Sequence, residues 1–384
     1  MKRLAIVTTH PIQYNAPLFK LLSERKNIEV KVFYTWEKGA EHFDQGFGRS
    51  FQWDIPLLEG YEYSFVSNNG NMGKGFWDVK NPNLIQSIKE WQPQAVLVYG
   101  WNYWSHLQVL RHFKGKIKVL FRGDSTLIGE KKGMKKLLRK WILKWIYSYV
   151  DYALYVGTNN KAYFQQYGLK EKQLIFVPHA IDNDRFSTEN RAQTEYRENL
   201  MQSMRLKDDT NSILFAGKFQ KKKNVALLLE AFKQLKLPSW KLILVGNGED
   251  EEQLKQASAG HEDIYFLPFQ NQMMIPAVYR LGKIFCLPSQ GQEETWGLAV
   301  NEAMASGRAV IVSDEVGCAV DLVEDGVNGY IFQSGNLGDL MDKMTMAAGQ
   351  DLLRMGNQSK LKIENWRFEV QAKQIEQLLT GTIG

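Results

Sequence analysis

The sequence predicts an α/β protein of two domains, each built on a parallel sheet. Short apolar runs alternate with amphipathic, helix-like runs almost throughout the chain, and this alternation is typical of βαβ units. A length of 384 residues exceeds what one ordinary hydrophobic core supports. A polar, charged stretch at residues 187–211 separates two alternating series. We therefore expect two doubly wound domains, with ligands bound in a cleft between the carboxyl ends of their strands.

The first series predicts the elements of the amino-terminal domain. Apolar runs predict strands, and amphipathic runs predict helices. Residues 35–71 break this rhythm, because they are rich in aromatic, glycine and polar residues, and we expect a hairpin or an ordered loop there. The strands are expected at 4–9, 29–35, 95–100, 118–123 and 152–157, and the helices at 15–26, 83–91, 105–113 and 133–150.

The second series predicts the carboxy-terminal domain in the same way. Strands are expected at 212–217, 241–246, 264–269, 284–289 and 309–312, and helices at 224–235, 249–258 and 296–304. The last amphipathic run is expected to form a helix that packs back toward the first domain. The resulting domains are 1–186, a linker or hinge at 187–209, a second domain at 210–365 and a C-terminal helix at 366–384.

Composition and charge exclude several classes of protein. Hydrophobic residues make up 44% and charged residues 23%, as in ordinary folded proteins. Cys286 and Cys318 both lie in apolar runs, which argues against a disulfide framework and for a reducing compartment. No cysteine or histidine pair has the spacing of metal ligands. The formal net charge of +6 is too small to indicate a nucleic-acid partner.

The apolar runs of the sequence are too short to indicate a signal peptide or a membrane span. The first apolar run has about five residues, which is too short for the core of a signal peptide. No run approaches the roughly 18 apolar residues of a membrane span. We expect a cytoplasmic protein.

Two glycine- and lysine-containing loops follow strands of the second domain. Gly217 ends one strand, and Lys218 and Lys223 follow in the loop before the next helix. A strand-end glycine allows close backbone approach, and the helix N-terminus and the two ammonium groups favour a diphosphate. A solvated lysine cluster explains the same residues without a ligand. Gly246 and Gly248 form part of a dinucleotide-binding pattern, although a simple turn is the alternative.

Two glutamates, Glu294 and Glu302, stand eight residues apart around a predicted helix. If most of the interval is helical, they lie about 12 Å apart along the axis. That separation is too long for a carboxylate pair on one glycosidic bond. It suits the ends of a nucleotide-sugar, with the amides of 296–298 facing the diphosphate. A capping Glu294 and a salt-bridged Glu302 are the alternative.

The stretch EETWGLAVNEAMASGRAVIVSDEVG, residues 293–317, resembles the signature of retaining glycosyltransferases of family 4, which have the GT-B fold of two Rossmann-like domains. Residues 322–332, 217–224 and 177–186 resemble further motifs of that family in its order. The resemblance implies transfer of a sugar from a nucleoside diphosphate sugar to a hydroxyl of a glycan or lipid-linked acceptor. It also implies cell-surface polysaccharide or glycoconjugate synthesis, with no metal and no cofactor.

Carried over residue by residue, the resemblance implies a role for each matching position. Glu302 would bind the ribose hydroxyls, and Glu294 would contact the transferred sugar. Lys218 and Lys223 would hold the diphosphate, and the amides of Trp296, Gly297 and Leu298 would contact sugar and phosphate. A nucleotide-sugar epimerase of the same fold and a non-catalytic nucleotide-sugar-binding partner of another transferase are the alternatives. An epimerase would convert donor without an acceptor.

The first domain departs from the family where many relatives carry a histidine near the sugar. Here Arg122 and Asp124 occupy the loop, and they are candidates for binding phosphate and orienting a hydroxyl. A local Arg–Asp turn is the alternative. On the acceptor side, His10 and Gln13 follow the first strand. Trp101 follows the 95–100 strand, where stacking on a sugar and core packing are equally open.

Residues 130–150 combine lysines and Arg139 with tryptophans, leucines and an isoleucine at helical spacing. A basic amphipathic helix with tryptophan suits the surface of an anionic membrane. The alternative is a surface helix whose apolar stripe serves only the core. We expect peripheral contact with an anionic membrane, at the inner face of the plasma membrane.

Overall fold

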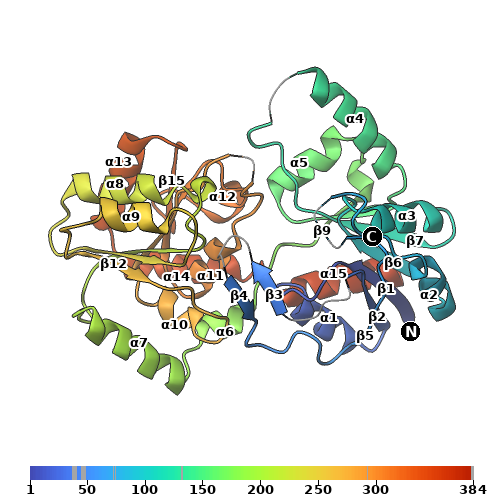
Figure 1. Cartoon of the computed structure of the whole chain (residues 1–384), viewed down its shortest axis with the longest axis horizontal. Coiled ribbons are helices and arrows are strands. Elements are labelled where there is room, and N and C mark those ends of the chain that lie inside the picture. The colour runs from blue at the N-terminus through green and yellow to red at the C-terminus, as the bar shows by residue number, and fades with distance from the viewer. Residues whose placement is uncertain are drawn as a thin grey trace. The chain divides into compact units, whose positions relative to one another are not determined.

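The computed structural model describes residues 1–36, 41–44, 49–71, 73, 75–130, 133–291 and 293–381. The chain divides into two compact units, each with its own parallel sheet (Figure 1). The first unit consists of Met1–Glu41, Pro56–His179 and Phe368–Gly384, and the second of His42–Ile55 and Ala180–Arg367. The chain therefore passes from one unit to the other four times.

The sheet of the first unit has seven strands in the order β5-β2-β1-β6-β7-β8-β9, all parallel. Its central strands are continuous apolar runs because helices cover both faces. The chain builds outward from β1 in one direction and from β6 in the other, so a topological switch point lies between them. The strands are β1 (Lys2–Thr8), β2 (Ile28–Tyr34), β5 (Glu62–Phe65), β6 (Ala95–Tyr99), β7 (Lys118–Arg122), β8 (Tyr152–Tyr155) and β9 (Leu174–Phe176).

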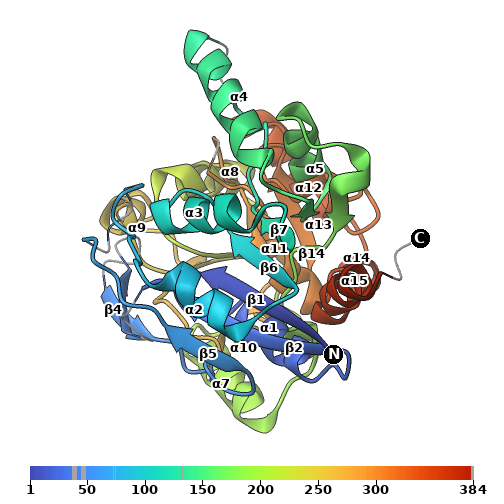
Figure 2. The same ribbon diagram turned by 90° about the vertical axis from the view of Figure 1, so that its right-hand side faces the viewer.

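Six α-helices among the described residues complete the first unit (Figures 1 and 2). The last of them, α15, packs on α1 and contacts β9. Arg25 and Glu376 form an ion pair of 3.6 Å there, and the Gln371 side chain donates to the Pro178 carbonyl. The helices are α1 (Ala16–Ser23), α2 (Leu84–Trp91), α3 (Trp104–Phe113), α4 (Met134–Tyr147), α5 (Thr158–Gln166) and α15 (Phe368–Thr380).

The sheet of the second unit has six parallel strands in the order β12-β11-β10-β13-β14-β15. Its switch point lies between β10 and β13. The strands are β10 (Ser212–Ala216), β11 (Lys241–Val245), β12 (Ile264–Leu267), β13 (Ile284–Leu287), β14 (Ala309–Ser313) and β15 (Gly329–Phe332). The helices are α6 (Asn183–Ser187), α7 (Arg191–Ser203), α8 (Val225–Leu235), α9 (Glu251–Ala257), α10 (Ile275–Tyr279), α11 (Leu298–Ala305), α12 (Ala319–Leu322), α13 (Leu337–Ala348) and α14 (Leu352–Ile363).

The segment 187–209, expected as a linker, contains α7 within the second unit. This helix buries little apolar surface, so hydrophobic periodicity does not reveal it. Its start is fixed by a capping box, in which the Asn190 side chain accepts from the Gln193 amide at 2.9 Å and the Gln193 side chain accepts from the Asn190 amide at 3.4 Å. The Asn-x-x-Gln spacing is the sequence signal for this helix.

The irregular segment 35–71 contains two short strands, β3 (Glu41–Asp44) and β4 (Arg49–Gln52), which pair in a sheet of their own. Residues 42–55 belong to the second unit. The Asp54 carboxylate accepts from the Met273 amide at 3.1 and 3.2 Å, and Trp53 lies 6.4 Å from Phe269 between ring centroids. The rest of the segment includes β5 of the first sheet.

Candidate functional site

The candidate donor-binding residues lie at the carboxyl edge of the second sheet. The loop 217–224 follows β10, and the loop 288–297 follows β13, which is its neighbour across the switch point. The two loops are tied by a hydrogen bond of 2.8 Å from the Gln290 amide to the Lys222 carbonyl. Ligands of doubly wound sheets bind outside the carboxyl ends of strands at such a point.

Lys223 and Glu294 form an ion pair that joins these loops. Both side chains are largely buried, with 17% and 12% exposed. The Ser289 hydroxyl donates to the same carboxylate oxygen, Oε2, at 2.9 Å. Their sequence neighbours Lys222 and Glu293 form a parallel pair at 3.0 Å that is much more exposed. The structure thus brings together one predicted phosphate-binding lysine and one predicted sugar-contacting glutamate.

Glu302 lies in α11 and is 4% exposed. Its Oε2 accepts from the Tyr279 hydroxyl at 2.7 Å. The predicted helix at 296–304 begins only at Leu298, so Glu294 precedes it in the loop. The separation of about 12 Å between the glutamates assumed a helix over most of the interval, and this assumption is wrong. The alternative expected a capping Glu294, whereas the structure places this residue in an ion pair with Lys223.

The backbone before α11 is held by close packing of glycines. Gly297 has φ +95°, and a Cβ there would lie 2.8 Å from Val316 Cγ1. A Cβ on Gly317 would lie 1.8 Å from the Thr295 carbonyl oxygen. The Trp296 ring is buried, and its indole N–H donates to Asn301 Oδ1 at 2.9 Å. Only the backbone of Trp296 is therefore a candidate for donor contact.

Gly246 and Gly217 meet at the ends of β11 and β10. Gly246 has φ +141°, and a Cβ there would lie 1.9 Å from the Gly217 carbonyl oxygen. The Gly217 amide donates to the Val245 carbonyl at 2.9 Å. Gly248 is similarly close to Phe219, whose carbonyl oxygen would lie 2.3 Å from an added Cβ. Close contact between the two strand-end loops explains why glycine stands at positions 246 and 248. Lys218, which directly follows Gly217, is half-buried.

In the first unit, Arg122 is 4% exposed at the end of β7. Its Nη1 donates to the Val177 carbonyl at 2.8 Å and its Nη2 to the Pro178 carbonyl at 3.2 Å. Burial lowers the pKa of Arg122, although nearby Tyr99 and Asp124 oppose this. The structure therefore gives Arg122 a positioning role, holding the chain that leads out of the first unit.

Asp124 lies beside His179, with 3.8 Å between Oδ2 and Nε2. The Asp124 side chain is half exposed. Burial lowers the pKa of His179, while the hydrogen bond with Asp124 raises it, and the net shift is downward. Among the sequence candidates in this loop, Asp124 keeps solvent-facing surface and Arg122 does not.

The acceptor-side candidates follow β1 and β6, which flank the switch point of the first sheet. The His10 ring stacks on Trp36 with centroids 4.9 Å apart, and Thr9 Oγ1 lies 3.0 Å from His10 Nδ1. Gln13 is 9% exposed. Trp101 packs against the hydrophobic core of the first unit, which favours the core-packing alternative for this residue.

Sequence reasoning missed three polar partners in these regions. Ser289 lies two residues after the end of strand β13, and this strand-end position is a signal that could have found it. Tyr279 and buried His106 offer no comparable signal, because only the folded chain brings Tyr279 to Glu302 and His106 to the Tyr99 carbonyl. No group of three or more metal-ligating side chains occurs among the described residues. None of the described helices is long and apolar enough to cross a membrane.

Comparison with solved structures identifies the fold as GT-B. The Anabaena protein HepE in complex with UDP aligns over 99% of this chain and 100% of its own, with a TM-score of 0.73 and 16% identity. The same protein in complex with UDP-glucose aligns with a TM-score of 0.70 and 15% identity, over 99% of this chain and 100% of its own. The predicted fold class, two Rossmann-like parallel-sheet domains, is confirmed.

Residues 196–358 match the model of the family described as glycosyl transferases group 1. An uncharacterized glycosyltransferase of Haemophilus influenzae is 29% identical over 168 residues, 42% of this chain and 46% of the relative. The lipopolysaccharide 1,2-N-acetylglucosaminetransferase of Salmonella typhimurium is 34% identical over 146 residues, 35% of this chain and 38% of the relative. The chain thus spans less than half of the length of these relatives.

Proposed function

We propose that this protein is a retaining glycosyltransferase that transfers a sugar from a nucleoside diphosphate sugar to a hydroxyl group. The Lys223–Glu294 pair at the carboxyl edge of the second sheet carries this proposal. It places a cation for phosphate and a carboxylate for sugar hydroxyls side by side, largely shielded from solvent. The structural relatives with UDP and UDP-glucose support a nucleotide-sugar donor.

Each candidate residue takes a role along the donor. Glu302, held by the Tyr279 hydroxyl, accepts the ribose hydroxyls. The diphosphate binds Lys218, Lys223 and the amide groups of 296–298 before α11. Glu294, held by Ser289, accepts hydroxyls of the transferred sugar. Asp124 is the candidate in the first unit for orienting a hydroxyl.

The reaction breaks the bond between the anomeric carbon and the diphosphate oxygen. The acceptor oxygen forms the new bond on the same face of the sugar, and its proton passes to the departing diphosphate. Negative charge grows on that oxygen as the bond breaks, so ammonium and amide groups fixed around it stabilise the transition state more than the ground state. These groups supply the positive charge, and we propose catalysis without a metal or cofactor.

The acceptor is proposed to be a glycan or a lipid-linked molecule, in cell-surface polysaccharide or glycoconjugate synthesis. The Salmonella relative is named for lipopolysaccharide, and a Mycobacterium leprae relative is a phosphatidyl-myo-inositol mannosyltransferase. Helix α4 supports a membrane-bound acceptor. Leu143, Ile146 and Tyr147 of α4 are buried in the core, whereas Leu138 and Trp141 are 65% and 68% exposed.

The exposed apolar residues of α4 form a second stripe. At about 100° per residue, they lie on the side of the helix roughly opposite the core. Lys140 and Lys144 flank that stripe, as cations do on helices that lie on anionic membranes. Core packing alone does not explain these exposed apolar residues, because they lie on the side of α4 that faces away from the core. The exposed apolar residues are Leu137, Leu138, Trp141, Ile142 and Trp145.

The sharpest test of the function compares adjacent glutamates. We expect Glu294→Gln to lower kcat by about 10²–10³-fold, because the variant loses charge beside the sugar while keeping its size. Glu293→Gln, next to it and exposed, is expected to keep wild-type activity. Nucleotide-sugars are incubated with an acceptor panel, and chromatography measures sugar transfer and nucleoside diphosphate release. Equal activity of the two variants would contradict the role of Glu294.

Two controls separate the alternative functions. Incubation of donor without acceptor reveals an epimerase, because a new nucleotide-sugar then accumulates. Calorimetry reveals a non-catalytic partner protein, because donor then binds without turnover on any acceptor of the panel. Either result would replace the proposed transferase.

A further inference from the structure

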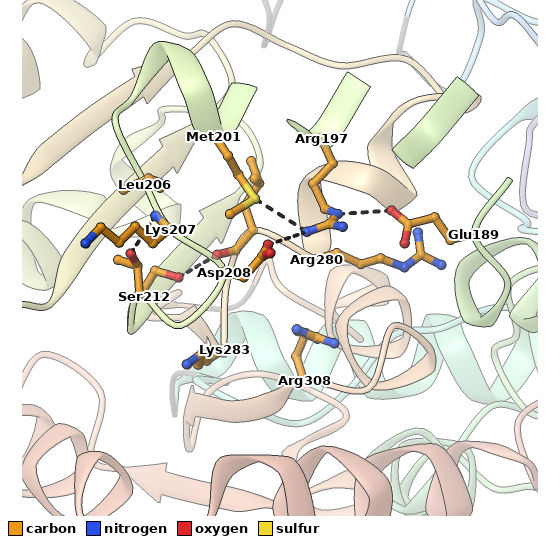
Figure 3. Close-up of a pocket in the computed structure, with 12 residues that line it drawn as sticks. Glu189, Arg197, Met201, Leu206, Lys207, Asp208, Ser212, Arg280, Lys283 and Arg308 are labelled. Carbon is orange, nitrogen blue, oxygen red and sulfur yellow. Dashed lines mark hydrogen bonds and ion pairs between the residues drawn. The ribbon is translucent and has the colours of Figure 1, made fainter. Parts of the chain in front are cut away.

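A polar cavity lies at the edge of the second sheet opposite the candidate donor residues. Its volume is about 290 Å³, and Figure 3 shows the side chains that line it. Ser212 opens β10, Lys283 directly precedes β13, and Arg308 directly precedes β14. The cavity therefore faces the amino ends of strands whose carboxyl ends carry the donor candidates. One strand of five residues separates the two edges by about 13 Å.

The charges around this cavity do not balance. Five basic side chains line it, against the two carboxylates of Glu189 and Asp208. Both carboxylates pair with Arg197, at 3.1 Å and 3.5 Å. In the part of the chain that the structure describes, the other four cations have no carboxylate within ion-pair distance. These cations are Lys207, Arg280, Lys283 and Arg308.

Two of the guanidinium groups are fixed by backbone carbonyls. Arg280 Nη2 donates to the carbonyls of Phe186 at 2.7 Å and Thr188 at 2.8 Å. Arg308 Nε donates to the Ser306 carbonyl at 2.9 Å, and its Nη1 donates to Gly282 at 3.0 Å. These bonds hold the groups in place without neutralising them. Arg280 Nη1 is buried and has no hydrogen-bond partner within the described residues.

A purely structural role explains Arg280 and Arg308 one at a time, but it does not explain why several cations surround one cavity. Arginine can clamp loops through carbonyl groups, and these two do. Burial, and then the neighbouring charges of Arg280 and Arg197, lower the pKa of Arg308 to about 10. Like charges held together, with one buried donor unpaired, oppose folding. An anion in the cavity offsets the repulsion among these like charges.

We propose that this cavity binds a small phosphorylated molecule, at a site separate from the donor site. Guanidinium groups match phosphate oxygens with pairs of hydrogen bonds, and two or more negative charges suit four unpaired cations. The Arg308 guanidinium contacts the phosphate, while Arg280, Lys207 and Lys283 supply further positive charge around it. The volume lies at the lower end of small-molecule sites, which begin near ~300 Å³, so the ligand is small.

The test uses inorganic pyrophosphate and inorganic phosphate as probes, with ionic strength held constant by sodium chloride. Thermal unfolding of the full chain is followed as the probe concentration rises, since a ligand of the folded state raises Tm. Glycerol serves as an uncharged probe. We expect both anions, but not glycerol, to raise Tm in a saturable way beyond the effect of chloride.

Four variants locate the site. Arg308→Gln is expected to weaken binding about tenfold or more, and Lys207→Gln about threefold. Lys207→Gln keeps every described hydrogen bond of this residue, because those bonds use its backbone N–H and carbonyl groups. Arg354→Gln, an exposed residue on α14, is expected to leave binding unchanged. Because the proposed donor site also takes a diphosphate, Lys223→Ala is expected to remove at most the part of the pyrophosphate shift that the donor site contributes. Unchanged binding in both pocket variants, complete loss of binding in Lys223→Ala, or no shift beyond chloride would overturn the proposal.

Discussion

At the scale of single residues, tertiary contacts decide what each polar group can do. His106 is fully buried in α3, where its Nδ1 lies 3.0 Å from the Tyr99 carbonyl and its Nε2 lies 3.1 Å from Thr35 Oγ1. Burial lowers its pKa to about 4, although hydrogen bonds to the carbonyls of Tyr99 and Gly100 raise it. The imidazole is therefore neutral at physiological pH, and its role is to join β6, α3 and the end of β2.

His106 predicts a pH dependence of stability. The unfolded chain, with an ordinary histidine pKa, binds more protons than the folded chain between pH 6.5 and 4. Stability is therefore expected to decrease as pH falls through this window, by about 3 kcal/mol from this residue. Urea unfolding at a series of pH values measures it. His106→Gln should flatten the dependence, and exposed His261→Gln should not; parallel curves for wild type and His106→Gln would refute the assignment.

Gly246 predicts a stability effect without any ligand. An alanine there would require φ +141° and a Cβ 1.9 Å from the Gly217 carbonyl oxygen. We expect Gly246→Ala to lower the free energy of unfolding by about 4 kcal/mol, through backbone strain and overpacking. Gly260→Ala is the matched control, because its φ is +81° with nothing near an added Cβ. It should cost about 1–2 kcal/mol, and equal losses would show that the close contact is unimportant.

At the scale of elements, helix α4 has one buried and one exposed apolar stripe. Figure 2 shows that it extends beyond the other helices of the first unit. Its buried stripe joins the core through Leu143, Ile146 and Tyr147. Trp145, on the exposed side, also contacts the Arg111 guanidinium, 5.7 Å from its ring centroid. The sequence shows one amphipathic pattern here, but only the fold reveals that the tryptophans face away from the core.

The exposed stripe of α4 predicts binding to anionic vesicles. Leu138→Ser is expected to weaken binding to phosphatidylglycerol-containing vesicles about tenfold, since one buried leucine contributes roughly 1.5 kcal/mol or more. Leu353→Ser, an exposed leucine on α14, is the matched control and should change nothing. Vesicle flotation measures the bound fraction. Binding that is equal in both variants, or independent of anionic lipid, would contradict a membrane role for α4.

The sequence predicted the elements well where the physics is local. Parallel strands buried on both faces are continuous apolar runs, so Ile284–Leu287 and Ala309–Ser313 were visible before folding. The lysine and glutamate of the candidate donor site were singled out because strand-end loops carry ligands and because their motifs resemble those of family 4 glycosyltransferases. Their pairing with each other, and the Tyr279–Glu302 bond, depend on packing between distant segments. Helix α7 was not predicted, because a polar helix lacks hydrophobic periodicity.

At the scale of the whole molecule, the chain forms two compact units, and the candidate donor residues belong to the second unit. We expect UDP to stabilise the protein, since a ligand at a hundred times its Kd adds about 2.7 kcal/mol. For a unit of this size the Tm should rise by about 5–10 °C. Lys223→Ala should reduce the rise, and exposed Lys222→Ala should not. A rise of the same size in both variants, measured by scanning calorimetry, would place nucleotide elsewhere.

The assignment of residues 42–55 to the second unit limits how this protein can be cut into parts. A fragment of residues 180–367 would lack the Asp54 carboxylate that caps the Met273 amide and the Trp53 ring beside Phe269. A fragment ending before residue 368 would equally expose the surface of α1 that α15 covers. Neither half is a continuous stretch of sequence, so truncation at the predicted boundaries should yield aggregation-prone pieces, and dissection is better pursued by point substitution.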